Sequence, residues 1–174
     1  TYNAGQSSMM YGYWTRVFKS GGYNLRNSVD LATFPDASPK ADDETVETLE
    51  FGMKTDFEKG RLNWAFFNTV VDDSQRMTNI QDPVSGVAQV VKNAGDIEYR
   101  GFEIDGVYTM TDTITMVASL GYVHSKYKNL ISDLTGDFII DALDYALEVP
   151  RAAPLTYSLG FNIDGNLGTW TVSY

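Results

Sequence analysis

The sequence predicts an all-β fold, an antiparallel up-and-down meander of about seven strands. The first observation is the period of two in residues 154–164, PLTYSLGFNID, where every second residue is apolar. Such alternation is typical of a strand with one apolar and one polar face. The second observation is an aromatic content of 13% together with a mean hydropathy of only −0.23. Aromatic residues therefore alternate with polar ones instead of gathering in long apolar runs.

The same alternation identifies the other strands in chain order. The pattern is clean in residues 47–57 and 97–108, and less so in residues 8–18, where both phases contain apolar side chains. Residues 138–148, FIIDALDYALE, allow either a short helix with Ile139, Leu143 and Leu147 on one face or an irregular loop. Strands are expected at residues 8–18, 47–57, 61–71, 97–108, 114–127, 155–163 and 170–174.

The third observation is that short and long connections alternate. The connections near residues 3–7, 58–60, 109–113 and 165–168 are short, whereas those at 19–44, 72–96 and 128–153 are long and polar. In a meander, every second connection lies at the same end, so one edge of the sheet has tight turns and the other has loops. Outer-membrane barrels have this arrangement, and a sandwich has no reason to adopt it.

We therefore expect the apolar phase to face lipid and the polar phase to face a wet lumen. The alternative is a soluble all-β ligand-binding module, for example a carbohydrate-binding one, whose aromatic side chains form a stacking platform. The aromatic residues expected to face lipid are Tyr11, Tyr13, Trp64, Phe66, Tyr108, Tyr122, Tyr157 and Phe161.

Composition excludes several classes of function. The net charge of −10 argues against nucleic acid as a partner. The chain has no cysteine, so disulfides and thiolate chemistry are excluded. No apolar run approaches the 18 residues of a transmembrane helix.

No catalytic, cofactor or metal site is expected. Glu103 and Asp105 share the polar phase, but acid–base catalysis also needs an enclosed site that perturbs their pKa values. The acidic runs 42–44 and 72–73 lack the spacing of a Ca²⁺ loop and are interpreted as solvated loops. The Gly21-Gly22 pair and residues 93–96 are interpreted as strand ends rather than binding loops.

Four segments, taken in order, resemble the barrel motifs of TonB-dependent outer-membrane receptors. Each resembles a strand end, turn or strand start of that family, and together they extend over essentially the whole chain. The segments are VFKSGGYN (17–24), ETVETLEFGMKTDFEKGRLNWAFFNTVVDDSQ (44–75), NAGDIEYRGFEIDG (93–106) and PRAAPLTYSLGF (150–161).

The resemblance implies that residues 1–174 form part of a 22-stranded transmembrane β-barrel. We expect a fragment of its C-terminal half, without the plug domain and the remaining strands. The implied location is the outer membrane of a Gram-negative bacterium, where the barrel contacts lipid.

The implied function is active transport of a scarce nutrient, which in this family is a ferric siderophore, haem, cobalamin or a glycan. The implied partners are that small molecule and the TonB complex, which would act through the absent N-terminal plug. The implied protein is no enzyme and needs no cofactor. The loop residues proposed to contact ligand are Tyr23, Asn24, Arg26 and Arg151.

Overall fold

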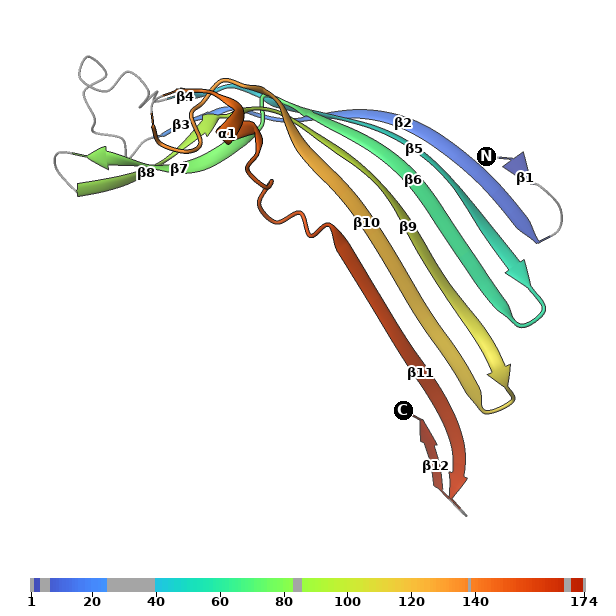
Figure 1. Ribbon diagram of the computed structural model, residues 1–174. Helices are drawn as coiled ribbons and strands as arrows, with labels where there is room; N and C mark the ends of the chain where they lie inside the picture. The colour runs from blue at the N-terminus through green and yellow to red at the C-terminus, as the bar shows by residue number, and fades with distance from the viewer. Residues whose placement is uncertain are drawn as a thin grey trace.

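The computed structural model describes residues 2–3, 7–24, 40–82, 86–137, 139–167 and 170–173. One curved antiparallel sheet dominates it, with the strand order β1-β2-β5-β6-β9-β10-β11-β12 (Figure 1). Each strand pairs with the next member of the sheet along the chain, as predicted for a meander. The strands are β1 (Tyr2–Asn3), β2 (Ser8–Lys19), β5 (Glu44–Phe57), β6 (Gly60–Asp72), β9 (Gly95–Thr111), β10 (Ile114–Leu130), β11 (Leu155–Leu167) and β12 (Trp170–Ser173).

Two small sheets lie in the long connections at one end of the main sheet. The first pairs β3 (Gly22–Tyr23) with β4 (Lys40–Ala41). The second is a hairpin of β7 (Gln75–Asp82) and β8 (Gly86–Asn93), which projects away from the main sheet (Figure 1). The long polar connection predicted at residues 72–96 therefore contains a hairpin that the sequence analysis did not predict.

The sheet is a single layer. Among the described residues, no second sheet packs on it, and many large apolar side chains of its long strands are exposed. A β-sandwich would bury these side chains between two sheets. No described helix is long and apolar enough to span a bilayer.

Alternation gives the sheet two distinct faces, which we call the Phe102 face and the Glu103 face after neighbouring residues of β9. Strand register aligns Phe51, Phe66, Phe102 and Tyr122 on the Phe102 face. With Trp64, they form a continuous series of ring contacts across four strands, with centroid distances of 5.7, 5.5, 6.0 and 5.8 Å. We call these five residues the aromatic row.

The prediction placed eight aromatic residues on one face, but Tyr11 and Tyr13 lie on the Glu103 face, opposite the other six, so the prediction was wrong for these two. Their hydroxyls donate to Glu50 Oε1 and Oε2, at 2.9 and 2.8 Å. Glu50 pairs with Phe67, one residue out of phase with the aromatic row. Because both phases of β2 contain apolar side chains, alternation left its orientation open, and the pairing with β5 decides it.

Between the aromatic row and the long loops, the side chains of the Phe102 face change from apolar to charged, and those of the Glu103 face change from polar to apolar. In β9, Arg100 and Glu98 continue the Phe102 face, whereas Tyr99 and Ile97 continue the Glu103 face. Pairing of β9 with β10 continues in register from Thr109 to Ile97, so no bulge causes the exchange. The aromatic row therefore separates an apolar band from a charged band on one face of the sheet.

Beyond the aromatic row, the Glu103 face is covered by the connection between β10 and β11. The buried cluster there consists of Ile97, Tyr127, Leu130 and Val149. The connection contains α1 (Ala142–Tyr145), a single turn rather than the longer helix allowed by residues 138–148. Ile139, Leu143 and Leu147 are all exposed, so no helix face formed by them is buried.

Candidate functional site

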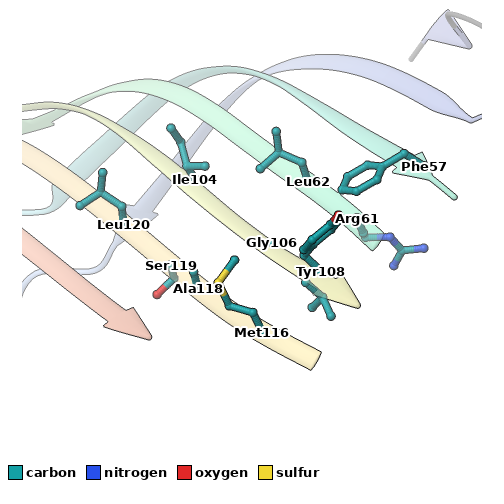
Figure 2. A pocket seen from close by; sticks show the side chains of 11 residues that line it. Phe57, Arg61, Leu62, Ile104, Gly106, Tyr108, Met116, Ala118, Ser119 and Leu120 are labelled. Carbon is teal, nitrogen blue, oxygen red and sulfur yellow. The ribbon is translucent and has the colours of Figure 1, made fainter. Parts of the chain in front are cut away.

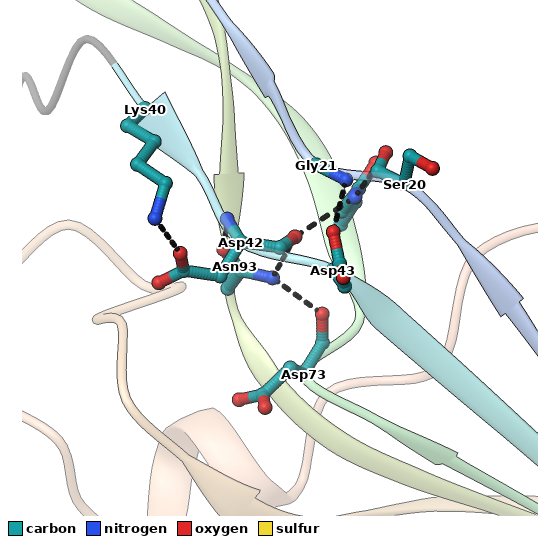
Figure 3. A network of polar contacts seen from close by, with 8 residues as sticks. Ser20, Gly21, Lys40, Asp42, Asp43, Asp73 and Asn93 are labelled. Atoms are coloured by element: carbon teal, nitrogen blue, oxygen red, sulfur yellow. Dashed lines mark hydrogen bonds and ion pairs between the residues drawn. The ribbon is translucent and has the colours of Figure 1, made fainter.

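The long connections are fixed to the sheet by a group of polar side chains and backbone atoms, which we call the loop-root cluster. Asn93 lies at its centre (Figure 3). Its Nδ2 donates to the carbonyl oxygens of Asp42 and Asp73 at 3.1 and 2.6 Å, and its Oδ1 accepts from the Asp42 backbone nitrogen at 2.7 Å. One amide therefore joins the ends of two different connections.

Gln75 extends the cluster to the first connection. Its Nε2 donates to the carbonyl oxygens of Ser20 and Asp42 at 3.2 and 2.9 Å. Its backbone nitrogen donates to Glu44 Oε2 at 2.7 Å. Gly21 lies beside it and donates its backbone N–H to Asp43 Oδ1 at 2.7 Å.

The third connection, between β10 and β11, is hydrogen-bonded to the loop-root cluster through residues 93–96. The backbone nitrogen of Ile131 donates to Ala94 O at 3.1 Å, and Asn129 Nδ2 donates to Asp96 Oδ2 at 2.7 Å. The residues of three separate sequence motifs, 21–22, 73–75 and 93–95, therefore meet at one end of the sheet. The cluster sets where the long loops leave the sheet.

The acidic residues Asp42, Asp43 and Asp73 are exposed, as predicted for solvated loops, but two carboxylates of the first run also bind backbone. Asp43 and Glu44 accept backbone N–H groups, and Asp96 Oδ1 accepts from the backbone nitrogen of Asp73 at 3.0 Å. Within the described residues, no three His, Asp or Glu side chains are grouped as ligands for a metal ion. Among the described residues, the polar side chains of the cluster bind mainly backbone atoms.

Asp144 organises the connection between β10 and β11. Its carboxylate is fully buried and accepts the backbone N–H groups of Leu134, Thr135 and Asp141, at 2.7, 2.9 and 2.9 Å. These bonds favour the charged form, and the one from Asp141 contributes most to holding the pKa of Asp144 below its usual 3.8. Asp141 also caps α1, so the D-x-x-D spacing at 141–144 was a readable signal.

This connection should loosen at acid pH. Because the folded-state pKa of Asp144 is depressed, its contribution to stability is fully present above the unfolded value of 3.8 and is lost as the pH falls through the lower folded value. We expect hydrogen exchange of the Leu134 and Thr135 amides, corrected for intrinsic rates, to accelerate below pH 3.8. The Asp144→Asn variant should exchange faster at neutral pH and lack this pH dependence. A wild-type profile that stays flat from neutral pH to pH 2 would contradict the prediction.

The four proposed ligand-contact residues are placed in different surroundings. Tyr23 lies in β3 and is 70% exposed. The side-chain amide of Asn24 donates from Nδ2 to Val91 O and accepts at Oδ1 from Val91 N, both at 2.8 Å. These two bonds join the first connection to β8. Arg151 is exposed on the connection before β11, and Arg26 lies outside the described residues. Their contact with ligand stays a prediction.

A groove of about 400 Å³ lies on the Phe102 face, between the aromatic row and the short turns (Figure 2). It opens where Gly106 and Ala118 pair, because these small residues leave space between the larger side chains around them. Its lining is almost entirely apolar, so the groove suits a hydrocarbon chain. The larger side chains around it are Phe57, Leu62, Ile104, Tyr108, Met116 and Leu120.

Comparison with known proteins agrees with this geometry. The family model described as "TonB dependent receptor-like, beta-barrel" matches residues 1–174. The structure is similar to the crystal structure of the ferric yersiniabactin uptake receptor FyuA from Yersinia pestis, with a TM-score of 0.72 and 17% identity over 98% of this chain and 23% of that one. It is also similar to the copper transporter OprC, with a TM-score of 0.66 and 18% identity over 94% of this chain and 23% of that one. The chain thus spans less than a quarter of the length of either protein.

Proposed function

Because the chain belongs to the TonB-dependent receptor family, we propose that it is a section of barrel wall in a receptor that imports a scarce nutrient across the outer membrane. The observation that carries the proposal is the match of the family's barrel model to the whole of residues 1–174. The family consists of transport receptors rather than enzymes. The proposed cargo is a small molecule of the class of ferric siderophores, haem, cobalamin or glycans, and the proposed energy source is the TonB complex.

The apolar band fits the proposed place in the membrane. It runs along β9 from Phe102 to Met110, about nine residues, which matches the length of a membrane-spanning strand. At about 3.3 Å per residue and a tilt of about 40°, this stretch spans roughly 23 Å, close to the apolar band of about 25 Å in outer-membrane barrels. The long loops then lie outside the cell and the short turns in the periplasm.

The proposal is tested by uptake in cells that carry the full-length receptor. We expect the receptor to fractionate with the outer membrane. Its deletion should abolish growth on one compound of a panel of ferric siderophores, haem, cobalamin, glycans and copper complexes. Uptake of a labelled form of that compound should need both the receptor and TonB. Recovery of the receptor in the soluble fraction, or uptake that is equal with and without TonB, would contradict the proposal.

A further inference from the structure

We propose that the connection between β10 and β11 contacts the cargo at the mouth of the barrel, and that this cargo is a ferric siderophore with hydrocarbon segments and a positive charge. The contact is made by five exposed apolar side chains, which we call the apolar loop segment, and by the carboxylates beside them. The inference rests on the proposed function, which places the Glu103 face inside the barrel. The apolar loop segment consists of Ile139, Ile140, Leu143, Tyr145 and Leu147.

The connection lies over the inner side of the wall, at the end of the sheet where the long loops lie (Figure 1). Val149 packs with Ile97 and Tyr127, which belong to the Glu103 face of β9 and β10. The backbone nitrogen of Leu130 donates to the Tyr145 hydroxyl at 3.1 Å, so α1 is joined to the end of β10. Because the buried side of the connection faces the sheet, its exposed side faces the axis of the barrel.

The apolar loop segment is exposed where lipid cannot cover it. Its side chains are 40–63% exposed, although all five belong to residues 139–147. Exposed apolar side chains of the apolar band face lipid, but this connection lies beyond the aromatic row and over the opposite face of the sheet. A group of exposed apolar side chains in water is typical of a binding site. The hydrocarbon part of a ligand is the chemistry that would cover it.

The charge of the connection favours a cation. Residues 131–150 contain five carboxylates and no lysine or arginine. Among the described residues, no lysine or arginine forms an ion pair with Asp137, Asp141 or Glu148, which are all exposed. These carboxylates alternate in the sequence with the apolar loop segment. A ligand held by hydrocarbon contacts there also meets a negative potential, which attracts cations and repels anions.

The other long connections have the same sign of charge. Together, residues 19–44, 72–96 and 128–153 contain fourteen of the 23 Asp and Glu residues of the chain, but only seven of its 13 Lys and Arg residues. One of these seven, Lys128, lies 3.6 Å from Glu98 on the Phe102 face, which is the outside of the wall. The part of the mouth that this chain forms is therefore acidic.

This combination of surfaces distinguishes among the proposed classes of cargo. Haem carries negative propionates, and glycans lack a hydrocarbon segment, while the periphery of cobalamin carries polar amides. A ferric trihydroxamate has a core without net charge, because its hydroxamates balance the charge of the iron. With hydrocarbon linkers and a terminal ammonium it is an amphiphilic cation, which complements both the apolar loop segment and the carboxylates.

The test measures binding of a series of ferric trihydroxamates to the full-length receptor in detergent. The forms differ in one end group, which is a free ammonium or the same amine carrying an acetyl, hexanoyl or succinyl group. The ammonium form should bind about tenfold more tightly than the negatively charged succinyl form, the low end of electrostatic effects in charged clefts. The hexanoyl form should bind at least about fourfold more tightly than the acetyl form, the effect of burying one further CH₂ group.

Variants separate the two contributions. Asp141→Asn/Glu148→Gln should reduce only the preference for the ammonium form, since asparagine keeps the side-chain oxygen that caps α1. Glu148→Gln alone is used if the double variant does not fold. Leu143→Ser should reduce only the preference for the hexanoyl form. The matched control Glu58→Gln/Asp112→Asn removes two exposed carboxylates from the short turns at the opposite end of the sheet, and should change neither preference.

A Leu143→Cys variant tests whether other loops of the receptor cover the apolar loop segment instead. The cysteine should react with a water-soluble maleimide in the free receptor, and more slowly with the ammonium form bound. Failure to react in the free receptor would overturn the inference. So would binding of none of the forms, equal binding of the ammonium and succinyl forms or of the hexanoyl and acetyl forms, or an equal change in the control variant.

Fractionation and uptake are measured on the same variants. TonB-dependent uptake of an anionic or carbohydrate compound, without binding of the ammonium form, would overturn only this inference. Recovery of the receptor in the soluble fraction would overturn the proposed function.

Discussion

Replacement of Leu159 by arginine is expected to lower the free energy of unfolding of the receptor by about 2–4 kcal/mol, the cost of a cation on the lipid face near the midplane. Leu159 is 64% exposed on the Phe102 face and pairs with Ala118, about midway along the apolar part of β11. The measurement is a guanidinium titration of the receptor folded in phospholipid vesicles.

The neighbouring variant Ser158→Arg is the control, because it places the same cation on the Glu103 face. Ser158 and Ser119 share a hydrogen bond of 2.7 Å between their hydroxyls, so we expect a cost of about 1 kcal/mol from losing that bond. If Leu159 lay in a packed core between two sheets, arginine would abolish folding instead. A cost near zero for Leu159→Arg would contradict both a lipid-facing and a core position.

Replacement of Gly95 by alanine is the second large effect that we expect. Gly95 has a φ of +122°, a conformation that costs roughly 1–3 kcal/mol for residues other than glycine. An added Cβ would also overlap the carbonyl oxygen of Asn129. Relief of that overlap must move β9 away from β10, close to where the loop-root cluster joins the third connection. We expect the unfolding free energy to fall by more than the backbone strain alone, and the long loops to become sensitive to added protease.

Comparison of Gly136→Ala with Gly95→Ala separates the cost of backbone strain from the cost of steric overlap with the added Cβ. Gly136 has a φ of +86°, but among the described residues no atom beyond Gly136 and its two chain neighbours lies within 4 Å of the position of an added Cβ. This variant should show only the strain of about 1–3 kcal/mol, confined to its own connection. An equal cost for the two variants would mean that close packing at Gly95 contributes nothing.

Much of the sheet could be predicted because alternation is a local property of the chain. Residues 47–57, 97–108 and 155–163 assign one phase to each face, and the structure places Phe51, Phe102 and Leu159 on the same face, as the pattern requires. The orientation of β2 was not predictable in this way, because apolar residues in both phases fit either face. The β7–β8 hairpin was missed since its polar and apolar residues alternate only weakly.

Alternation and connection lengths were enough to predict a meander of strands with unequal ends, and the ordered motifs indicated the family. A period of two and the lengths of connections are written in the chain and need no knowledge of what packs on what. The meeting of Gln75, Asn93 and Gly21 in one cluster could not be predicted, because strand pairing between distant parts of the chain brings these residues together. The same holds for Arg100, Lys126 and Lys128, the three cations around the carboxylate of Glu98. Two of them lie on the strand next to it, and electrostatic attraction acts through space rather than along the chain.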